Sequence, residues 1–100
     1  MKNFKTLDLA IDFCKLTKSL KVTGPLKDQL LRASTSIALN LAEGRGRRTT
    51  KDQLKFFNIA LGSIRECETI LKILEIDDQI ISNKLNHLAA STYLLIKNAL

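Results

Sequence analysis

The sequence predicts an all-α protein, an antiparallel up-down-up-down four-helix bundle in which residues 1–100 form a single domain. Apolar residues recur three or four positions apart through four segments, which is the spacing of one helical face. The four glycines and the single proline fall mostly between those segments. One hundred residues with 45% apolar content suffice for one continuous core with short connections between helices.

The first two helices are predicted from their apolar spacing and their end signals. The first is expected over residues 7–21, with Thr6 as its N-cap. The second is expected to begin at Pro25, because the first turn of a helix leaves its amides unpaired and tolerates a missing one. Gly44 is expected to end this helix after Glu43 in the left-handed conformation.

The third and fourth helices follow polar segments that contain capping residues. Thr49 or Thr50 is expected to cap the third helix, and Thr50 and Gln53 have the spacing of a capping box. A polar gap at residues 77–78 separates the third helix from the fourth, and Ser82 is expected to cap the fourth.

The third helix, which is expected to continue to about Glu75, has two adjoining apolar stripes. One holds Leu54, Phe57, Leu61, Ile64 and Leu71, and the other holds Phe56, Ala60, Ser63, Cys67, Ile70 and Leu74. Together they cover more than half of the circumference, whereas an edge helix needs a face of only about 100°. We therefore expect self-association into a homo-oligomer. The alternative is that both stripes pack against neighbouring helices within one bundle.

The remaining arc of the third helix is basic. It carries Lys51, Lys55, Arg65 and Lys72 without an acid, and Arg45, Arg47 and Arg48 precede it in the loop. The row from first to last lysine spans about 30 Å at the helical rise, comparable to one turn of duplex nucleic acid. Together with a formal net charge of +6, these seven residues predict binding of an RNA or DNA backbone. The alternative is a solvated face that only keeps the protein soluble.

Two more specific readings of this region are disfavoured. The second and third helices resemble a helix-turn-helix, but a third helix of about 25 residues with an apolar arc is unlike an exposed recognition helix. The glycine-containing basic loop lacks the Gly-Lys-Ser/Thr ending of a phosphate-binding P-loop and follows no strand.

Polar residues of the second and third helices are expected to meet in a structural layer that fixes helix register. The layer comprises Arg32, Ser36, Asn40, Glu43, Ser63 and Glu66. An acid/base site on Glu43 and Glu66 would need a pocket and a further catalytic group, which the sequence does not supply. We therefore expect no catalytic residue and no enzymatic activity.

The remaining reactive side chains give no metal or redox signature. Cys14 and Cys67 fall on apolar stripes, where small buried thiols in a reducing compartment are expected. Two thiols and His87 do not form the paired ligands of a zinc site, so neither a metal nor a cofactor is expected. No apolar run reaches the roughly 18 residues of a membrane span, and a cytoplasmic location is expected.

Residues 28–68 resemble the four helix bundle protein family, also called 23S rRNA intervening sequence proteins or S23-type ribosomal proteins. The resemblance is carried by Gln29, Arg32, Ala33, Ser36, Ile37, Asn40, Ala42, Glu43, Gly44, Gly46, Arg47, Phe57, Ile59, Ala60, Gly62, Ser63 and Glu66. It implies a four-helix bundle that assembles into a homopentamer with a basic surface. A related branch is the accessory protein of diversity-generating retroelements, which implies nucleic acid and a reverse transcriptase as partners. An interaction scaffold that docks a protein partner is therefore the alternative function.

Overall fold

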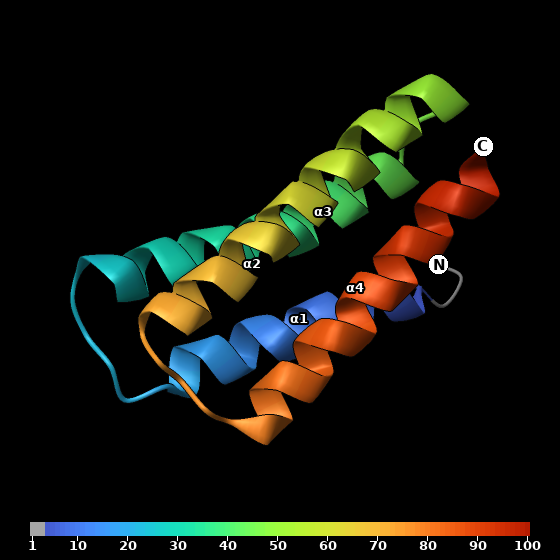
Figure 1. Cartoon of the computed structure of the whole chain (residues 1–100). Helices are drawn as coiled ribbons and strands as arrows, with labels where there is room; N and C mark the ends of the chain where they lie inside the picture. The colour runs from blue at the N-terminus through green and yellow to red at the C-terminus, as the bar shows by residue number, and fades with distance from the viewer. Residues whose placement is uncertain (1–3) are drawn as a thin grey trace.

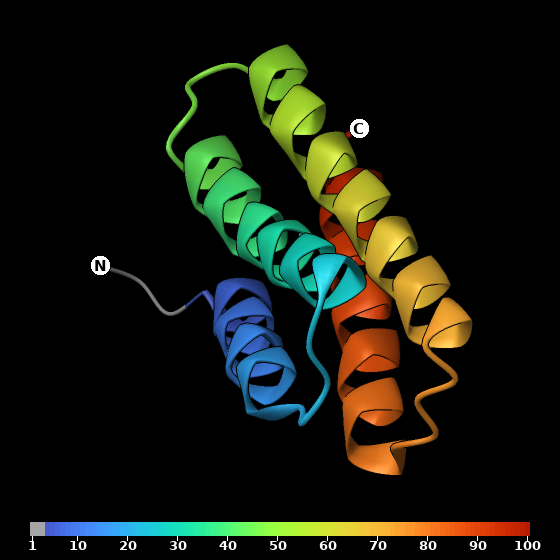
Figure 2. The same ribbon diagram turned by 90° about the vertical axis from the view of Figure 1, so that its left-hand side faces the viewer.

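The computed structural model describes residues 4–100, which form four α-helices without a strand (Figure 1). The helices are α1 (Lys5–Ser19), α2 (Pro25–Arg45), α3 (Thr50–Ile73) and α4 (Gln79–Ala99). The α1–α2 and α3–α4 connections lie at one end, and the α2–α3 connection lies at the other, beside the start of α1 and the end of α4 (Figures 1 and 2). Consecutive helices therefore run in opposite directions, and the predicted all-α four-helix fold is confirmed.

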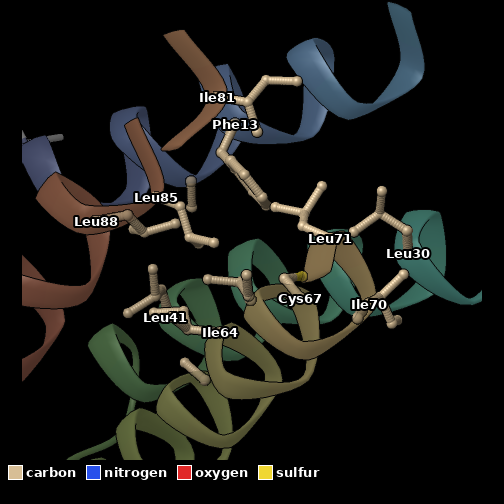
Figure 3. Packing of buried hydrophobic residues seen from close by; sticks show 14 of the residues in the cluster. Phe13, Leu30, Leu41, Ile64, Cys67, Ile70, Leu71, Ile81, Leu85 and Leu88 are labelled. Atoms are coloured by element: carbon tan, nitrogen blue, oxygen red, sulfur yellow. The ribbon is translucent and has the colours of Figure 1, made fainter. Parts of the chain in front are cut away.

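The core lies along the axis of a bundle that measures 40 × 22 × 22 Å. Each helix packs against its neighbours in sequence, and α1 packs against α4 to close the ring. Buried side chains from all four helices meet inside it, including Phe13 of α1, Leu41 of α2, Ile64 of α3 and Leu88 of α4 (Figure 3). Burial of such apolar side chains supplies the main favourable contribution to folding.

Both apolar stripes of α3 are used within the chain. Every residue of the two stripes is buried or half-buried, because α3 packs against α2 on one side and α4 on another. The wide apolar arc therefore agrees with packing inside one bundle and gives no argument for self-association. Assembly into an oligomer remains a prediction.

The prediction that Gly44 ends α2 in the left-handed conformation is wrong. Gly44 is a buried helical residue, and α2 continues to Arg45 before Gly46 at φ −82° forms the C-cap. A Cβ atom at Gly44 would lie 2.7 Å from Cε1 and 2.8 Å from Cδ1 of Phe57. Glycine is needed here because α2 and α3 approach closely, not because the backbone turns.

The start of α3 agrees with one of its two predicted caps. The Thr49 hydroxyl accepts a hydrogen bond from the Asp52 amide at 3.1 Å, so Thr49 caps the helix. The predicted capping box between Thr50 and Gln53 does not form. The Gln53 side chain instead donates to the Arg47 carbonyl at 3.1 Å and so braces the loop.

The predicted caps of α1 and α4 are wrong. Asp78 caps α4, where its Oδ1 accepts from the amides of Ile80 and Ile81 at 2.9 and 3.1 Å, and Ser82 lies inside the helix. A carboxylate satisfies two free amides there, so the helix begins one turn earlier than expected. Thr6 lies inside α1, buried, and its hydroxyl pairs with the Ser91 hydroxyl of α4.

Candidate nucleic-acid interface

Five of the seven predicted basic residues gather at the α2–α3 end of the bundle. We define this basic corner as Arg45, Arg47, Arg48, Lys51 and Lys55, all of which are exposed. Residues 43–55 contain these five cations and two carboxylates, which leaves a net charge of +3. Half of the formal charge of +6 therefore lies in thirteen residues at one end of the molecule.

Aromatic rings hold three of these cations in place. The Arg47 guanidinium lies 4.7 Å from the centroid of Phe56 and also pairs with the Glu43 carboxylate at 3.2 Å. The Lys55 ammonium lies 5.7 Å from the same ring centroid. The Arg45 guanidinium lies 4.5 Å from the Phe4 ring, at the start of α1. Cations held against aromatic faces lose less side-chain freedom when they bind an anion.

The backbone of the corner is fixed by the contacts described for the fold. The close approach of Gly44 to Phe57 sets the distance between α2 and α3. The Thr49 cap and the bond from Gln53 to the Arg47 carbonyl hold the connection between them. The cations are therefore presented from a braced loop and two helix ends.

The other two predicted residues, Arg65 and Lys72, lie in a more acidic setting. Arg65 forms an ion pair with Glu68 at 3.0 Å, so the basic arc of α3 is not isolated from acids as its sequence implied. Lys72 lines a cavity of about 460 Å³ together with Glu68, Glu75 and Asp77. Positive potential along α3 is thus strongest at its start and weaker towards its end.

The predicted polar layer is present between α2 and α3 as a smaller group. The Ser36 and Ser63 hydroxyl oxygens lie 3.0 Å apart, and the Asn40 amide donates to the Ser36 carbonyl at 2.8 Å and hydroxyl at 3.1 Å. The other three predicted members, Arg32, Glu43 and Glu66, are exposed and make no hydrogen bond to this group. Their longer charged side chains stay in water because burial of a charge is costly.

Sequence reasoning missed two further hydroxyl pairs between helices. Thr17 of α1 and Ser34 of α2 are fully buried, and their oxygens lie 3.2 Å apart. Thr6 and Ser91 form the corresponding pair between α1 and α4. These pairs could have been predicted from Ser and Thr residues that fall within apolar stripes. A buried hydroxyl group needs a hydrogen-bond partner, so such residues are expected to pair.

The two cysteines differ in their surroundings. Cys14 is half-buried, with its Sγ 3.5 Å from the Ser34 hydroxyl and 3.6 Å from that of Thr35. Cys67 is fully buried in the core, and burial, followed by the negative charge of Glu66, raises the pKa of its thiol to about 12. Cys67 therefore stays protonated at neutral pH and is a poor nucleophile.

The described residues provide neither a metal-binding cluster nor a membrane span. Within residues 4–100, no three His, Cys, Asp or Glu side chains are grouped closely enough to hold a metal ion. His87 is exposed and lines a groove between α1 and α4. None of the helices in this range has the length and apolar character needed to cross a membrane.

The fold and the charges together define a small four-helix bundle with a basic connection between α2 and α3. The model of the 23S rRNA-intervening sequence protein family matches residues 4–98, and the chain belongs to this family. The fold is similar to that of a protein with unknown function from the S23 ribosomal protein family of Bacteroides thetaiotaomicron. The two are 27% identical, with a TM-score of 0.78 over 93% of this chain and 92% of the other. A search of curated proteins found no match.

Proposed function

We propose that this protein binds the phosphate backbone of nucleic acids through the basic corner, and that it does so without enzymatic activity. The observation that carries the proposal is the shortage of acids near exposed cations. Arg45, Arg48, Lys51 and Lys55 form no ion pair with any acid among residues 4–100, and only Arg47 is paired. Each such cation can neutralise a phosphate and release the counterions condensed on the nucleic acid.

The four unpaired cations act together. The end of α2 and the start of α3 meet in the corner, so their dipoles largely offset each other and the side chains carry the positive potential. The potentials of closely placed charges sum, which raises the local concentration of a polyanion and its association rate.

The corner has few groups that read bases. Its amide side chain, Gln53, is already bonded to the Arg47 carbonyl, and the ring of Phe56 is approached by two cations. Readout of adenine depends on a free Asn or Gln amide, which the corner does not offer. The unpaired Arg45 and Arg48 lie at the α2–α3 connection and not along a helix that could enter a groove. We therefore expect binding that depends on charge and salt and little on sequence.

The test is fluorescence anisotropy with short single-stranded RNA, single-stranded DNA and duplex DNA across a salt series. The variant Arg48→Glu/Lys51→Glu changes two exposed cations of the corner, and Lys18→Glu/Lys21→Glu makes the same charge change at the opposite end. We expect the corner variant to lose about 100-fold in affinity and the slope of log K against log salt to fall by about two. The control variant should lose much less.

Two results would contradict the proposal. Equal losses in both variants would mean that net charge, not the corner, sets the affinity. A wild-type protein that fails to bind any of the three probes at low salt would favour the alternative of an interaction scaffold that docks a protein such as a reverse transcriptase.

We further propose that the chain self-associates. Large apolar side chains remain on the surface of α2 and α3, with Leu39, Ile59 and Ile73 exposed by 64, 42 and 59%. Covering such side chains in an interface removes apolar surface from water. Size-exclusion chromatography with light scattering at micromolar concentration tests this proposal, and a monomer would contradict it.

A further inference from the structure

Two cations of the basic corner share one aromatic ring, that of Phe56. Arg47 approaches this ring from the α2–α3 connection, with its guanidinium 4.7 Å from the ring centroid. Lys55 approaches it from the first turns of α3, with its ammonium at 5.7 Å. The ring of Phe4 has the Arg45 guanidinium against it. Within residues 4–100, Phe56 is therefore the ring that brings cations from two different elements together.

The base of the Phe56 side chain is held by α2. A Cβ atom at Gly44 would lie 3.1 Å from the Cβ atom of Phe56, so α3 is in close contact with the α2 backbone at this point. The Phe56 side chain is half-buried, which leaves part of its ring for side chains at the surface. Close packing at the base of a side chain limits its rotamers. The ring is thus a well-defined support for the two cations.

The shared ring keeps the charges of Arg47 and Lys55 close together. Because both lie against the same centroid, at 4.7 and 5.7 Å, they are at most about 10 Å apart. Without a common support, two like charges on long side chains would separate, since they repel each other and gain conformational freedom. The acids of residues 43–55 are Glu43 and Asp52, and the five cations outnumber them. The pair therefore remains in a positive setting that attracts phosphates.

We propose that Phe56 is a positioning residue of the nucleic-acid interface, whose ring holds Arg47 and Lys55 together so that both bind phosphates of one strand. This inference rests on the proposed function and adds an uncharged residue to the site. Cations that are already in place lose less side-chain entropy when an anion binds. In this role the ring acts through the cations and does not stack on a base, as aromatic residues of many single-strand binding sites do.

The experiment replaces Phe56 by leucine, which keeps an apolar side chain, and by tyrosine, which keeps an aromatic face. Phe13→Leu is the matched control, because it makes the same change at a buried ring of α1 that has no cation of residues 4–100 against it. Anisotropy measures the affinity for a labelled 20-nucleotide oligothymidine across a salt series, and thermal melting verifies that each variant is folded at the assay temperature.

We expect Phe56→Leu to bind about fivefold more weakly than the wild type, because two cation–ring contacts are lost. Its salt slope should be unchanged, because no charge is altered. Phe56→Tyr and Phe13→Leu should both bind as the wild type does. Rescue by tyrosine is not expected of a residue whose only role is to fill space.

A double-mutant cycle separates positioning from direct contact with the strand. In the Arg47→Gln/Lys55→Gln background, Phe56→Leu should cause no further loss at low salt, because the ring then has no cation to hold. A loss that persists in this background would mean that the ring itself contacts the nucleic acid, and the inference would be overturned.

Other results would also decide the matter. Wild-type affinity in Phe56→Leu would overturn the inference while the basic corner stands. An equal loss in Phe13→Leu would trace the effect to stability and overturn the inference as well. A wild-type protein that does not bind the probe at low salt would refute the proposed function itself.

Discussion

The connections at the two ends of α3 both join consecutive antiparallel helices, but they carry opposite charge. Each joins the C-terminus of one helix to the N-terminus of the next, so the helix dipoles favour the same charge pattern in both. Residues 43–55 carry a net charge of +3, whereas residues 66–78 contain one cation and five carboxylates and carry −4. Helix ends alone do not account for this difference. Most of the positive charge of the α2–α3 connection is not used in ion pairs among residues 4–100, which agrees with the proposed contact to nucleic acid.

Packing differs between the same two regions. At the basic end, Gly44 contacts Phe57 and the connection is braced by Gln53. At the acidic end, a cavity of about 460 Å³ lies between α3 and α4, beside Leu71 and Leu85. This cavity opens to solvent and most of its lining residues are polar. Gly44 and Phe57, by contrast, leave no room for a Cβ atom between the helices, so a tight contact between helices is seen at the basic end. A rigid set of cations binds an anion with a smaller entropic cost.

Both ends of the bundle share one core, and Cys67 lies in it. Alkaline pH should therefore lower the free energy of unfolding of the whole chain, and this is the largest effect that we expect. The pKa of the Cys67 thiol is raised to about 12 by burial, so the unfolded chain releases this proton at a lower pH than the folded chain. Stability from this group is complete below about pH 9 and is lost as pH rises, by about 1.4 kcal/mol per unit.

Urea unfolding from pH 8 to 11 under reducing conditions measures this loss. The Cys67→Ala variant should show a shallower alkaline decline than the wild type, even though it is less stable at pH 8. Parallel profiles would show that ionisation of this thiol does not oppose folding. If the ends were independent, probes placed at each end would report different transitions.

Tight packing at the basic end predicts a large cost for a single methyl group. Gly44→Ala should lower the free energy of unfolding by about 1–3 kcal/mol, because the Phe57 ring must move away from the new Cβ. Gly62→Ala in the same helix pair should instead raise it by about 1 kcal/mol. Urea denaturation of the two variants measures both signs. A neutral Gly44→Ala would mean that the two helices separate easily, contrary to a rigid corner.

The two N-caps allow the ends to be compared by loss of similar contacts. Asp78→Ala removes two hydrogen bonds at the acidic end and should cost about 1.5 kcal/mol, whereas Thr49→Ala removes one at the basic end and should cost about 1 kcal/mol. Nucleic-acid binding distinguishes them further. Thr49→Ala should weaken binding by loosening the corner, and Asp78→Ala should leave it unchanged in folded protein. If Thr49→Ala and Asp78→Ala changed nucleic-acid affinity equally, the α2–α3 end would have no special role in binding.

The smallest expected effect comes from the carboxylate inside the corner. Glu43→Gln removes the ion pair with Arg47, both partners of which are partly in water, and should cost less than about 0.5 kcal/mol in stability. The same change leaves Arg47 without its acid and should tighten nucleic-acid binding about twofold at low salt. Anisotropy titrations measure this gain, which weaker binding by the variant would contradict.

Much of the fold follows from spacing that is visible in the sequence. The apolar period places all four helices. Local residues narrow the cap of α3 to Thr49 or Thr50, and the structure uses Thr49. Gly44 was misread because a glycine near a helix end signals a turn as well as a close approach, and only the position of Phe57 separates the two. Ser82 is predicted as the cap of α4, whereas Asp78 caps it, because the sequence does not show how far α4 extends against the bundle.

The candidate site was predicted less completely. The five residues of the basic corner are close in sequence, so their common location followed from one short connection. The sequence does not predict the pairing of Arg65 with Glu68, because Glu68 lies outside the basic arc of the helix. The long Arg65 side chain nevertheless reaches Glu68 one turn further along α3. Ser36 and Ser63 meet because they are short and lie between two helices, while Glu66 has a charge that favours water.

The most direct test of the central claim is an NMR titration of the ¹⁵N-labelled protein with a short single-stranded oligothymidine at low salt. Binding through the basic corner predicts progressive shifts of the backbone amides of residues 45–55, with those of residues 72–78 unchanged. Shifts centred on residues 72–78, or an absence of shifts at residues 45–55 under binding conditions, would contradict the assignment of the nucleic-acid interface to the α2–α3 end.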